Sequence, residues 1–333
     1  MIASLLLSAL SGLSPVAVAE TGGAIVVWGG DAAVQEVPTG TNFTSIAAGR
    51  WNGMAITSDR EIVGWGTNLF GSLDVPAGRF IAVSGGYGQS MALREDHSLV
   101  AWGTNGSSGV PSGNDFEAIE SFALHRLALR ADGTLEGWGF NSDGQATVPT
   151  GNNFVALAAG YYHSLALTSD GSLVGWGRND QGQIDIPAGN DFIAVAAGDL
   201  HSLALKEDGS LVAWGSNSHG QAEVPAGNNF AAIAAGGYHN LALTHGGMVV
   251  AWGSNFKGQV DVPSGFTFTS IAAGRDHSIA LVAGPRVGID IKSGSDPNSI
   301  NLLSRGVIPV AILGSDTFDV ADVDVTTLAF GPE

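Results

Sequence analysis

The sequence predicts an all-β protein whose main part is a seven-bladed β-propeller, closed by its N- and C-terminal strands and followed by a short β-rich C-terminal segment. Three observations predict this fold. A Trp-Gly pair recurs every 36 to 38 residues, apolar residues alternate with small ones inside each copy, and the two ends of the repeated region carry complementary halves of one hairpin. With 49 glycines and only 13% charged residues, the composition also favours turns and short strands over surface helices.

The repeat is defined by three markers that keep the same spacing. The Trp-Gly tryptophans are Trp28, Trp65, Trp102, Trp138, Trp176, Trp214 and Trp252. A Val-Pro or Ile-Pro pair follows each of them, and a phenylalanine comes next, from Phe43 to Phe268. A period of this length indicates a solenoid or a propeller, in which each unit buries its apolar face against its neighbours.

Each copy is expected to contain short strands joined by tight turns. Alternating segments such as 192–196 and 203–205 have the period of a strand. The Asp-Gly pairs that end at Gly133, Gly171 and Gly209 lie between strands and supply the positive φ that a hairpin turn needs. Arg60 and His97 occupy the same place in their copies, where we expect another turn type because a bulky residue at positive φ is costly.

The phase of the repeat indicates how the chain closes. A polar residue opens the strand written HSLAL in residues 201–205, and in six copies the Trp of the paired strand follows 13 residues later. Trp28 has no such strand before it, and the strand at 277–281 has no Trp after it. Pairing these two halves makes a ring without exposed strand edges, so we predict a closed propeller over residues 24–284.

The segment AAGYYHSLALTSDGSLVGWGRNDQGQIDIPAGNDF, residues 158–192, resembles the regulator of chromosome condensation repeat, and the resemblance extends over residues 24–284. The connection of the form WGxNxxGQxxVPAG is most similar in style to a secreted bacterial propeller that inhibits β-lactamases. The resemblance implies a closed propeller that acts as a binding scaffold, with aromatic residues before each HSLAL strand touching the partner.

The candidate binding residues occupy the two positions before the polar residue that opens each HSLAL strand. These positions vary between copies and hold all four tyrosines and the one tryptophan outside the Trp-Gly set. Our candidates are Arg50, Trp51, Tyr87, Leu124, Tyr161, Tyr162, Leu200, Tyr238 and Arg275. Equivalent positions in a propeller lie on one face, and aromatic side chains with arginine are typical of binding hot spots. The alternative is that these rings pack between blades, because aromatic side chains are more often buried than functional.

Other residues allow weaker predictions. The loops after each Trp-Gly vary, and we expect ordinary sequence variation of exposed connectors there rather than a second contact surface.

The aligned histidines are His125, His163, His201, His239 and His277. We expect them to form hydrogen bonds inside their blades rather than a zinc site, because zinc ligands must converge at about 2 Å. Arg50 and Arg275 should lie on adjacent blades, where a pair of arginines can hold an anion.

Charge and composition exclude several function classes. A net charge of −18 with only three lysines disfavours nucleic acid, whose binding depends on cationic side chains. The absence of cysteine excludes disulfides and thiol catalysis, and no nucleophile with a base and an orienting group stands out. We therefore expect a monomeric, non-catalytic scaffold that binds a protein partner, without a cofactor. The alternatives are a carbohydrate-binding or hydrolytic propeller enzyme and, by family analogy, a guanine-nucleotide exchange role.

The two ends of the chain predict location and a further module. Residues 1–19 have the apolar stretch and small-x-small site of a secretory signal peptide, and no segment is long enough to span a membrane, so we expect a bacterial protein that is secreted, periplasmic or held in the cell envelope. Residues 287–333 are expected to be an incomplete β-rich module of a longer protein. Its acidic residues Asp316, Asp319, Asp322 and Asp324 are calcium candidates, although solvated turns are the favoured interpretation.

Overall fold

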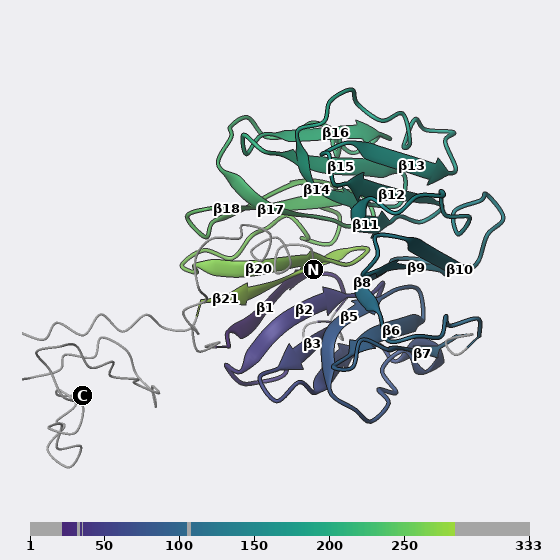
Figure 1. The fold of residues 1–333 in the computed structure, drawn as a ribbon. Coiled ribbons are helices and arrows are strands. Elements are labelled where there is room, and N and C mark those ends of the chain that lie inside the picture. Colours follow the sequence, from purple (N-terminus) through teal and green to yellow (C-terminus); the bar gives the residue numbers. More distant parts are fainter. Residues whose placement is uncertain (1–21, 32–33, 35, 105–107, 284–333) are drawn as a thin grey trace, which may run out of the picture. The chain divides into compact units, whose positions relative to one another are not determined.

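Seven three-stranded antiparallel sheets follow one another along the chain, as the computed structural model in Figure 1 shows. The structure describes residues 22–31, 34, 36–104 and 108–283. The expected signal peptide at 1–19, the C-terminal module at 287–333 and the four calcium candidates lie outside these residues. The all-β propeller that the repeat predicts is confirmed.

Each sheet is one blade, and its strands alternate around a middle strand of the HSLAL type. Blade 1 is β2 (Phe43–Ala48), β3 (Asn52–Thr57) and β4 (Ile62–Gly66); blade 2 is β5 (Phe80–Gly85), β6 (Gln89–Arg94) and β7 (Leu99–Gly103); blade 3 is β8 (Phe116–Ser121), β9 (His125–Arg130) and β10 (Leu135–Gly139). Blade 4 is β11 (Phe154–Ala159), β12 (His163–Thr168) and β13 (Leu173–Gly177); blade 5 is β14 (Phe192–Ala197), β15 (His201–Lys206) and β16 (Leu211–Gly215). Blade 6 is β17 (Phe230–Ala235), β18 (His239–Thr244) and β19 (Val249–Gly253); blade 7 is β20 (Phe268–Ala273), β21 (His277–Val282) and the N-terminal β1 (Ala24–Gly29). A short 3-10 turn spans Leu69–Gly71.

The ring closes through blade 7, as the repeat phase predicts. Strand β1 pairs antiparallel with β21, so that Ala24 faces Val282 and Gly29 faces His277. Figure 1 shows the purple β1 beside the yellow-green β21. The first strands of successive blades also contact one another in an unbroken cycle that returns from β20 to β2. No blade therefore lacks a neighbour.

The hairpin turns correct one of our predictions. Gly133, Gly171 and Gly209 have φ of +80°, as expected, but Arg60 and His97 also adopt positive φ, +63° in both cases. The turn keeps its type because its backbone hydrogen bonds are kept: the N–H of Arg60 donates to Thr57 at 2.9 Å, and that of Gly133 donates to Arg130 at 2.9 Å. The expectation of a different turn at these two positions was wrong, since the shared hydrogen bonds outweigh the local strain.

The core is divided into clusters between neighbouring blades. Trp214 of blade 5, for example, packs with Leu165 and Leu167 of blade 4. Its indole N–H donates to the backbone oxygen of Gln183 at 2.9 Å, in the connector between the two blades. Tryptophan at this position therefore joins two blades through both packing and a hydrogen bond.

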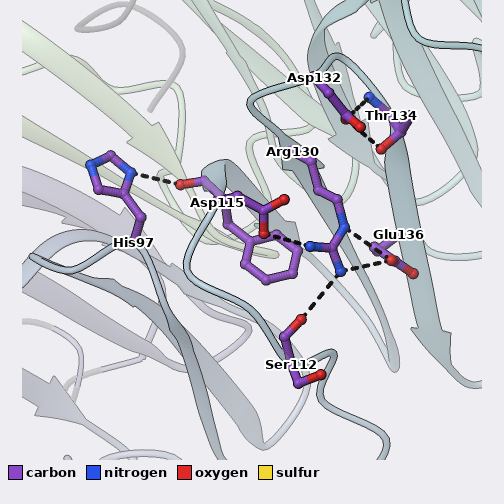
Figure 2. A network of polar contacts seen from close by, with 8 residues as sticks. His97, Ser112, Asp115, Arg130, Asp132, Thr134 and Glu136 are labelled. Carbon is purple, nitrogen blue, oxygen red and sulfur yellow. Dashed lines mark hydrogen bonds and ion pairs between the residues drawn. The ribbon is translucent and has the colours of Figure 1, made fainter.

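The two ends of the propeller differ in what they expose. We call the end with the hairpin turns the turn face, and the end with the variable positions before each middle strand the loop face. On the turn face, Figure 2 shows Arg130 between Asp115 and Glu136, with a further hydrogen bond to the backbone oxygen of Ser112. Asp132 caps its own turn by accepting hydrogen bonds from Thr134.

Candidate functional site

Two sets of loops come together on the loop face because of strand register. Middle and third strands are antiparallel, so the residue that opens the middle strand faces the end of the Trp-Gly strand, as His163 faces Gly177. The residue after Trp-Gly then bonds back to the variable pair, with the N–H of Arg178 donating to Tyr162 at 2.9 Å. Both variable loops of a blade are thus held side by side.

Three of the four tyrosines predicted as contacts surround a cavity of about 240 Å³ on this face. Its lining residues are Arg50, Tyr161, Tyr162, Arg178, Asp199, Leu200, Tyr238 and Arg275. The rings of Tyr161 and Tyr162 meet edge to face with their centroids 4.5 Å apart, and the guanidinium of Arg178 lies 5.2 Å from the centre of the Tyr162 ring. Six of our nine candidate residues therefore line one cavity.

Trp51 and Tyr87 form a second aromatic group next to this cavity. Their ring centroids are 5.0 Å apart, and the guanidinium of Arg50 lies over both rings, at 4.8 Å from Trp51 and 4.6 Å from Tyr87. A cation over aromatic faces is held by attraction to the ring quadrupole. This stack links the cavity, through Arg50, to the aromatic rings of blades 1 and 2.

Charge is distributed unevenly around the cavity. Asp199 is buried, and its carboxylate accepts from Nε of Arg275 at 3.4 Å, while its second oxygen has no partner. Burial raises the pKa of Asp199, although the neighbouring Arg275 and Arg50 act to lower it. Arg275 also pairs with Asp276 at 3.8 Å. Arg50 lines the same cavity but forms no ion pair with any described carboxylate, and the weaker idea that the two arginines hold an anion stays a prediction.

The structure also places the remaining candidates. All nine candidate side chains are partly exposed. Leu200 lines the cavity with the tyrosines. Leu124 lies apart from them, in a separate cavity between blades 2 and 3.

The loops after Trp-Gly add residues that we did not include among the candidates. Phe140 contacts Tyr162 with centroids 6.4 Å apart, and His219 lies 5.1 Å from Tyr238 and 5.5 Å from Phe256. Phe256 is 83% exposed. The aromatic residues of these loops are visible in the sequence. That they lie against the tyrosines follows only from the strand register, which brings the two loops of a blade together.

The five histidines form a buried layer under the loop face, and they correct a second prediction. In four of the five, the hydrogen bond from Nε2 runs between blades and not within one, while Nε2 of His277 has no partner: His163 donates through Nε2 to the hydroxyl of Ser202 at 3.0 Å, and that hydroxyl donates to the backbone oxygen of Gln183. His125, His201 and His239 repeat this contact with the following blade. The direction was missed because the repeat gives spacing along the chain but not the orientation of a side chain.

Burial also fixes the protonation of this layer. It lowers the pKa to about 4 in His125, His201 and His277 and to about 3 in His163 and His239. The histidines are therefore neutral at ordinary pH. Within the described residues, no group of three or more His, Asp or Glu side chains is placed to hold a metal ion.

Glu120 is a further ionisable group that we did not predict, and it is half-buried. It lies on β8 and lines the cavity at the centre of the ring, where the equivalent residue of blade 4 is Ala158. Burial raises the pKa of Glu120 to about 7. Blade 3 thus departs from the repeat at a position where the other blades carry alanine or serine.

With this geometry established, the family comparison decides what the repeat is. Residues 154–183, 192–221 and 230–259 match the regulator of chromosome condensation (RCC1) repeat in three tandem copies. Three tandem RCC1 repeats are therefore present in this chain. The matched copies begin at Phe154, Phe192 and Phe230, the first residues of three blades. No curated protein matches the sequence.

Solved structures with the same propeller fold agree with this result. Prp20p of Saccharomyces cerevisiae matches with a TM-score of 0.68 at 18% identity, covering 79% of this chain and 92% of that protein. Human WBSCR16 matches with a TM-score of 0.62 at 19% identity, covering 73% and 87%. The ectodomain of the Physcomitrella patens receptor kinase CR4 matches with a TM-score of 0.62 at 23% identity, covering 73% and 71%. The likeness to a β-lactamase inhibitor has no support among these matches.

Within the described residues, no helix has the length and apolar character that crossing a bilayer requires.

Proposed function

We propose that this RCC1-repeat protein is a non-catalytic binding scaffold that recognises a protein partner with its loop face. The observation that carries the proposal is the grouping of Trp51, the four tyrosines and three arginines, all partly exposed, around one cavity and its rim. Such side chains present large, rigid contact areas that lose little conformational entropy on binding.

The charges on this face suggest how the partner is oriented. Arg50 is fixed over Trp51 and Tyr87 and has no carboxylate partner among the described residues. An acidic side chain of the partner would satisfy it with a charge-assisted hydrogen bond. A guanidinium already held by two rings loses little freedom when it binds, so this contact favours orientation at low entropic cost.

Proteins of the same fold support a role in protein recognition. Prp20p has binding properties toward Gsp1p and histones, and yeast RCC1 (Prp20) has been crystallised bound to Kap60. The low sequence identity means that the fold, not the partner, is shared. We further propose that the protein acts outside the cytoplasm, which rests on the signal-like residues 1–19 alone.

The test is affinity capture with the full chain as bait, from culture supernatant and envelope fractions, followed by mass spectrometry and a Kd for the captured protein. We expect Trp51→Ala and Tyr162→Ala each to weaken binding by about 2 kcal/mol or more, a rise in Kd of about 30-fold.

A matched control lies on the other end of the propeller. Met248 is 64% exposed beside a hairpin turn, so Met248→Ala should leave the Kd unchanged. If the Met248 variant lost binding while the Trp51 and Tyr162 variants kept it, the loop face would not be the site. Turnover of glycoside or ester substrates by the purified protein would contradict the non-catalytic role.

A further inference from the structure

The cavity on the loop face contains a buried carboxylate with unused acceptor capacity. Asp199 lines this cavity, and its side chain is only 6% exposed. Its Oδ2 accepts from Nε of Arg275 at 3.4 Å, which is long for a charge-assisted hydrogen bond, and its Oδ1 has no partner. Because a buried charge is costly unless it is fully hydrogen-bonded, a further cationic donor would be favoured beside Asp199.

The variable positions of three successive blades hold this carboxylate in place. The backbone N–H of Asp199 donates to the oxygen of Gly237 at 3.1 Å, and the N–H of Gly237 donates to the oxygen of Arg275 at 3.0 Å. A Cβ on Gly237 would lie 2.9 Å from Cγ of Arg275 and 3.4 Å from Oδ2 of Asp199. Glycine in blade 6 therefore lets Arg275 of blade 7 reach Asp199 of blade 5, and the carboxylate is positioned before any ligand binds.

Arg50 adds a cation without a counter-charge to the same cavity. Of the three arginines in the cavity wall, Arg178 and Arg275 already pair with carboxylates. Arg50 forms no ion pair with a described carboxylate, and its Nε is buried without a hydrogen-bond partner. Its guanidinium is held over the rings of Trp51 and Tyr87. One cavity is thus lined by a cation and by an anion that do not pair with each other.

The rest of the cavity wall is aromatic and apolar. It consists of Tyr161, Tyr162, Tyr238 and Leu200. The cavity has a volume of about 240 Å³, and a cavity of roughly 150 Å³ is enough to hold benzene. There is therefore room for a ligand that places a ring or a branched side chain among the tyrosines while its polar end reaches the charged side chains.

We propose that the loop-face cavity binds a free α-amino acid with an aromatic or apolar side chain. The ligand's carboxylate binds the guanidinium of Arg50, its ammonium group donates to the carboxylate of Asp199, and its side chain lies among the tyrosines. A ligand with only one of the two charges would leave either Arg50 or Asp199 without its partner. An amino acid carries both groups on one carbon, which a residue inside a peptide chain does not. The site needs only atoms of this chain, so it does not depend on the proposed protein partner.

The probe is L-phenylalanine, titrated into the full chain by calorimetry at neutral pH. It is compared at equal ionic strength with 3-phenylpropionate, which lacks the ammonium group, and with phenethylamine, which lacks the carboxylate. We expect a Kd of about 1 mM for L-phenylalanine and binding at least about tenfold weaker for each analogue, because each analogue loses one charge-assisted contact. The assignment would be overturned if either analogue bound as tightly as L-phenylalanine, or if L-phenylalanine did not bind at about 10 mM.

Variants separate the two polar contacts. Arg50→Met should weaken L-phenylalanine and 3-phenylpropionate alike, by about tenfold or more. Asp199→Asn should weaken L-phenylalanine by a similar factor but should not weaken 3-phenylpropionate, which has no ammonium group to donate to Asp199. Arg79→Met, on the turn face, should bind L-phenylalanine as the parent does.

An Asp199→Asn variant that keeps the parent's affinity for L-phenylalanine would contradict the proposal. If that variant does not fold, the comparison of the three ligands in the parent protein still decides. These titrations contain no protein partner, so their failure would leave the proposed protein recognition unaffected, and failure of affinity capture would leave this site unaffected.

Discussion

The turn face and the loop face both carry cations stacked on aromatic rings, but they use different rings. On the turn face, Arg94, Arg130 and Lys206 end three middle strands and lie over the framework residues Phe80, Phe116 and Phe192, which are at most 2% exposed. On the loop face, Arg50 and Arg178 lie over partly exposed side chains at positions that vary between copies of the repeat. The same interaction supports the scaffold at one end and remains open to a ligand at the other.

Ion pairing differs in the same way. Arg60, Arg79, Arg130 and Lys206 on the turn face each have a carboxylate within 3.1 Å. On the loop face, Arg178 and Arg275 also have carboxylate partners, but Arg50 has none among the described residues, and Asp199 keeps one oxygen without a partner. A repeated position whose charges are satisfied belongs to the structure, whereas an irregular position with unsatisfied groups is available for binding.

The largest expected effect tests the histidine layer that lies beneath the loop face. The contribution of these histidines to the free energy of unfolding is full above pH 6.5, where histidine is neutral in the folded and the unfolded chain. It decreases as the pH falls below 6.5, because the unfolded chain binds protons that the buried histidines of the folded chain do not bind. At about 1.36 kcal/mol per pKa unit, the loss approaches about 3 kcal/mol for each histidine whose pKa is about 4 and about 5 kcal/mol for each whose pKa is about 3, and it levels off below those values. Glu120 acts oppositely, since its contribution is present below pH 4.5 and is lost as the pH rises to about 7. The five histidines outweigh it, so urea unfolding should show a clear loss of stability between pH 7.5 and 5.0.

The control for this experiment is His163→Gln, because blade 2 already carries Gln89 at the same position. The variant lacks one group that titrates on unfolding, so its stability should depend less steeply on pH. An unfolding midpoint that is the same at pH 7.5 and 5.0 in the parent would contradict the buried, neutral state of the layer.

A smaller effect compares an arginine from each face. Arg130→Met loses contacts to Asp115, Glu136 and Ser112 and should lower the free energy of unfolding by about 1 to 2 kcal/mol, because the Arg130 side chain is only 18% exposed. Arg178→Met removes an ion pair to Asp180 in which both side chains are about 40% exposed, and should cost less than about 0.5 kcal/mol.

Chemical unfolding measures the stability of both variants, and a Kd for the partner measures their binding, for which we expect the opposite order. Arg178→Met should weaken the partner complex and Arg130→Met should not. If Arg178→Met lowered the free energy of unfolding more than Arg130→Met does, the proposed difference between the two faces would be wrong.

The smallest expected effect concerns strain on the turn face. Arg60 holds φ at +63°, and its ion pair to Glu95 is exposed, with Glu95 also bound by Arg79. Asparagine tolerates this backbone region better than arginine, so Arg60→Asn should raise the free energy of unfolding by about 0.5 kcal/mol without changing partner affinity. A destabilised variant would mean that the ion pair outweighs the strain.

Much of the fold could be predicted because the repeat supplies its own phase. Trp28 and the strand at 277–281 reveal the closing pair from sequence alone, and the tyrosines reveal the loop face by their shared slot. Contacts between side chains of different blades could not be predicted, because they depend on how the blades are placed relative to one another. The pairing of Asp199 with Arg275 joins residues 76 positions apart, and nothing in either local sequence signals it.

Blade 7 is assembled from the first and last strands of the ring, and this has a consequence for synthesis. As the nascent chain leaves the ribosome, β1 emerges with no partner, because β21 is translated after every other strand. Blades 1 to 6 consist of local hairpins that can form as they appear, whereas the last pairing bears the full entropy of closing the longest loop in the molecule. Until translation has passed Val282, β1 is an unpaired edge, and chaperones that bind extended apolar segments would have their longest opportunity there.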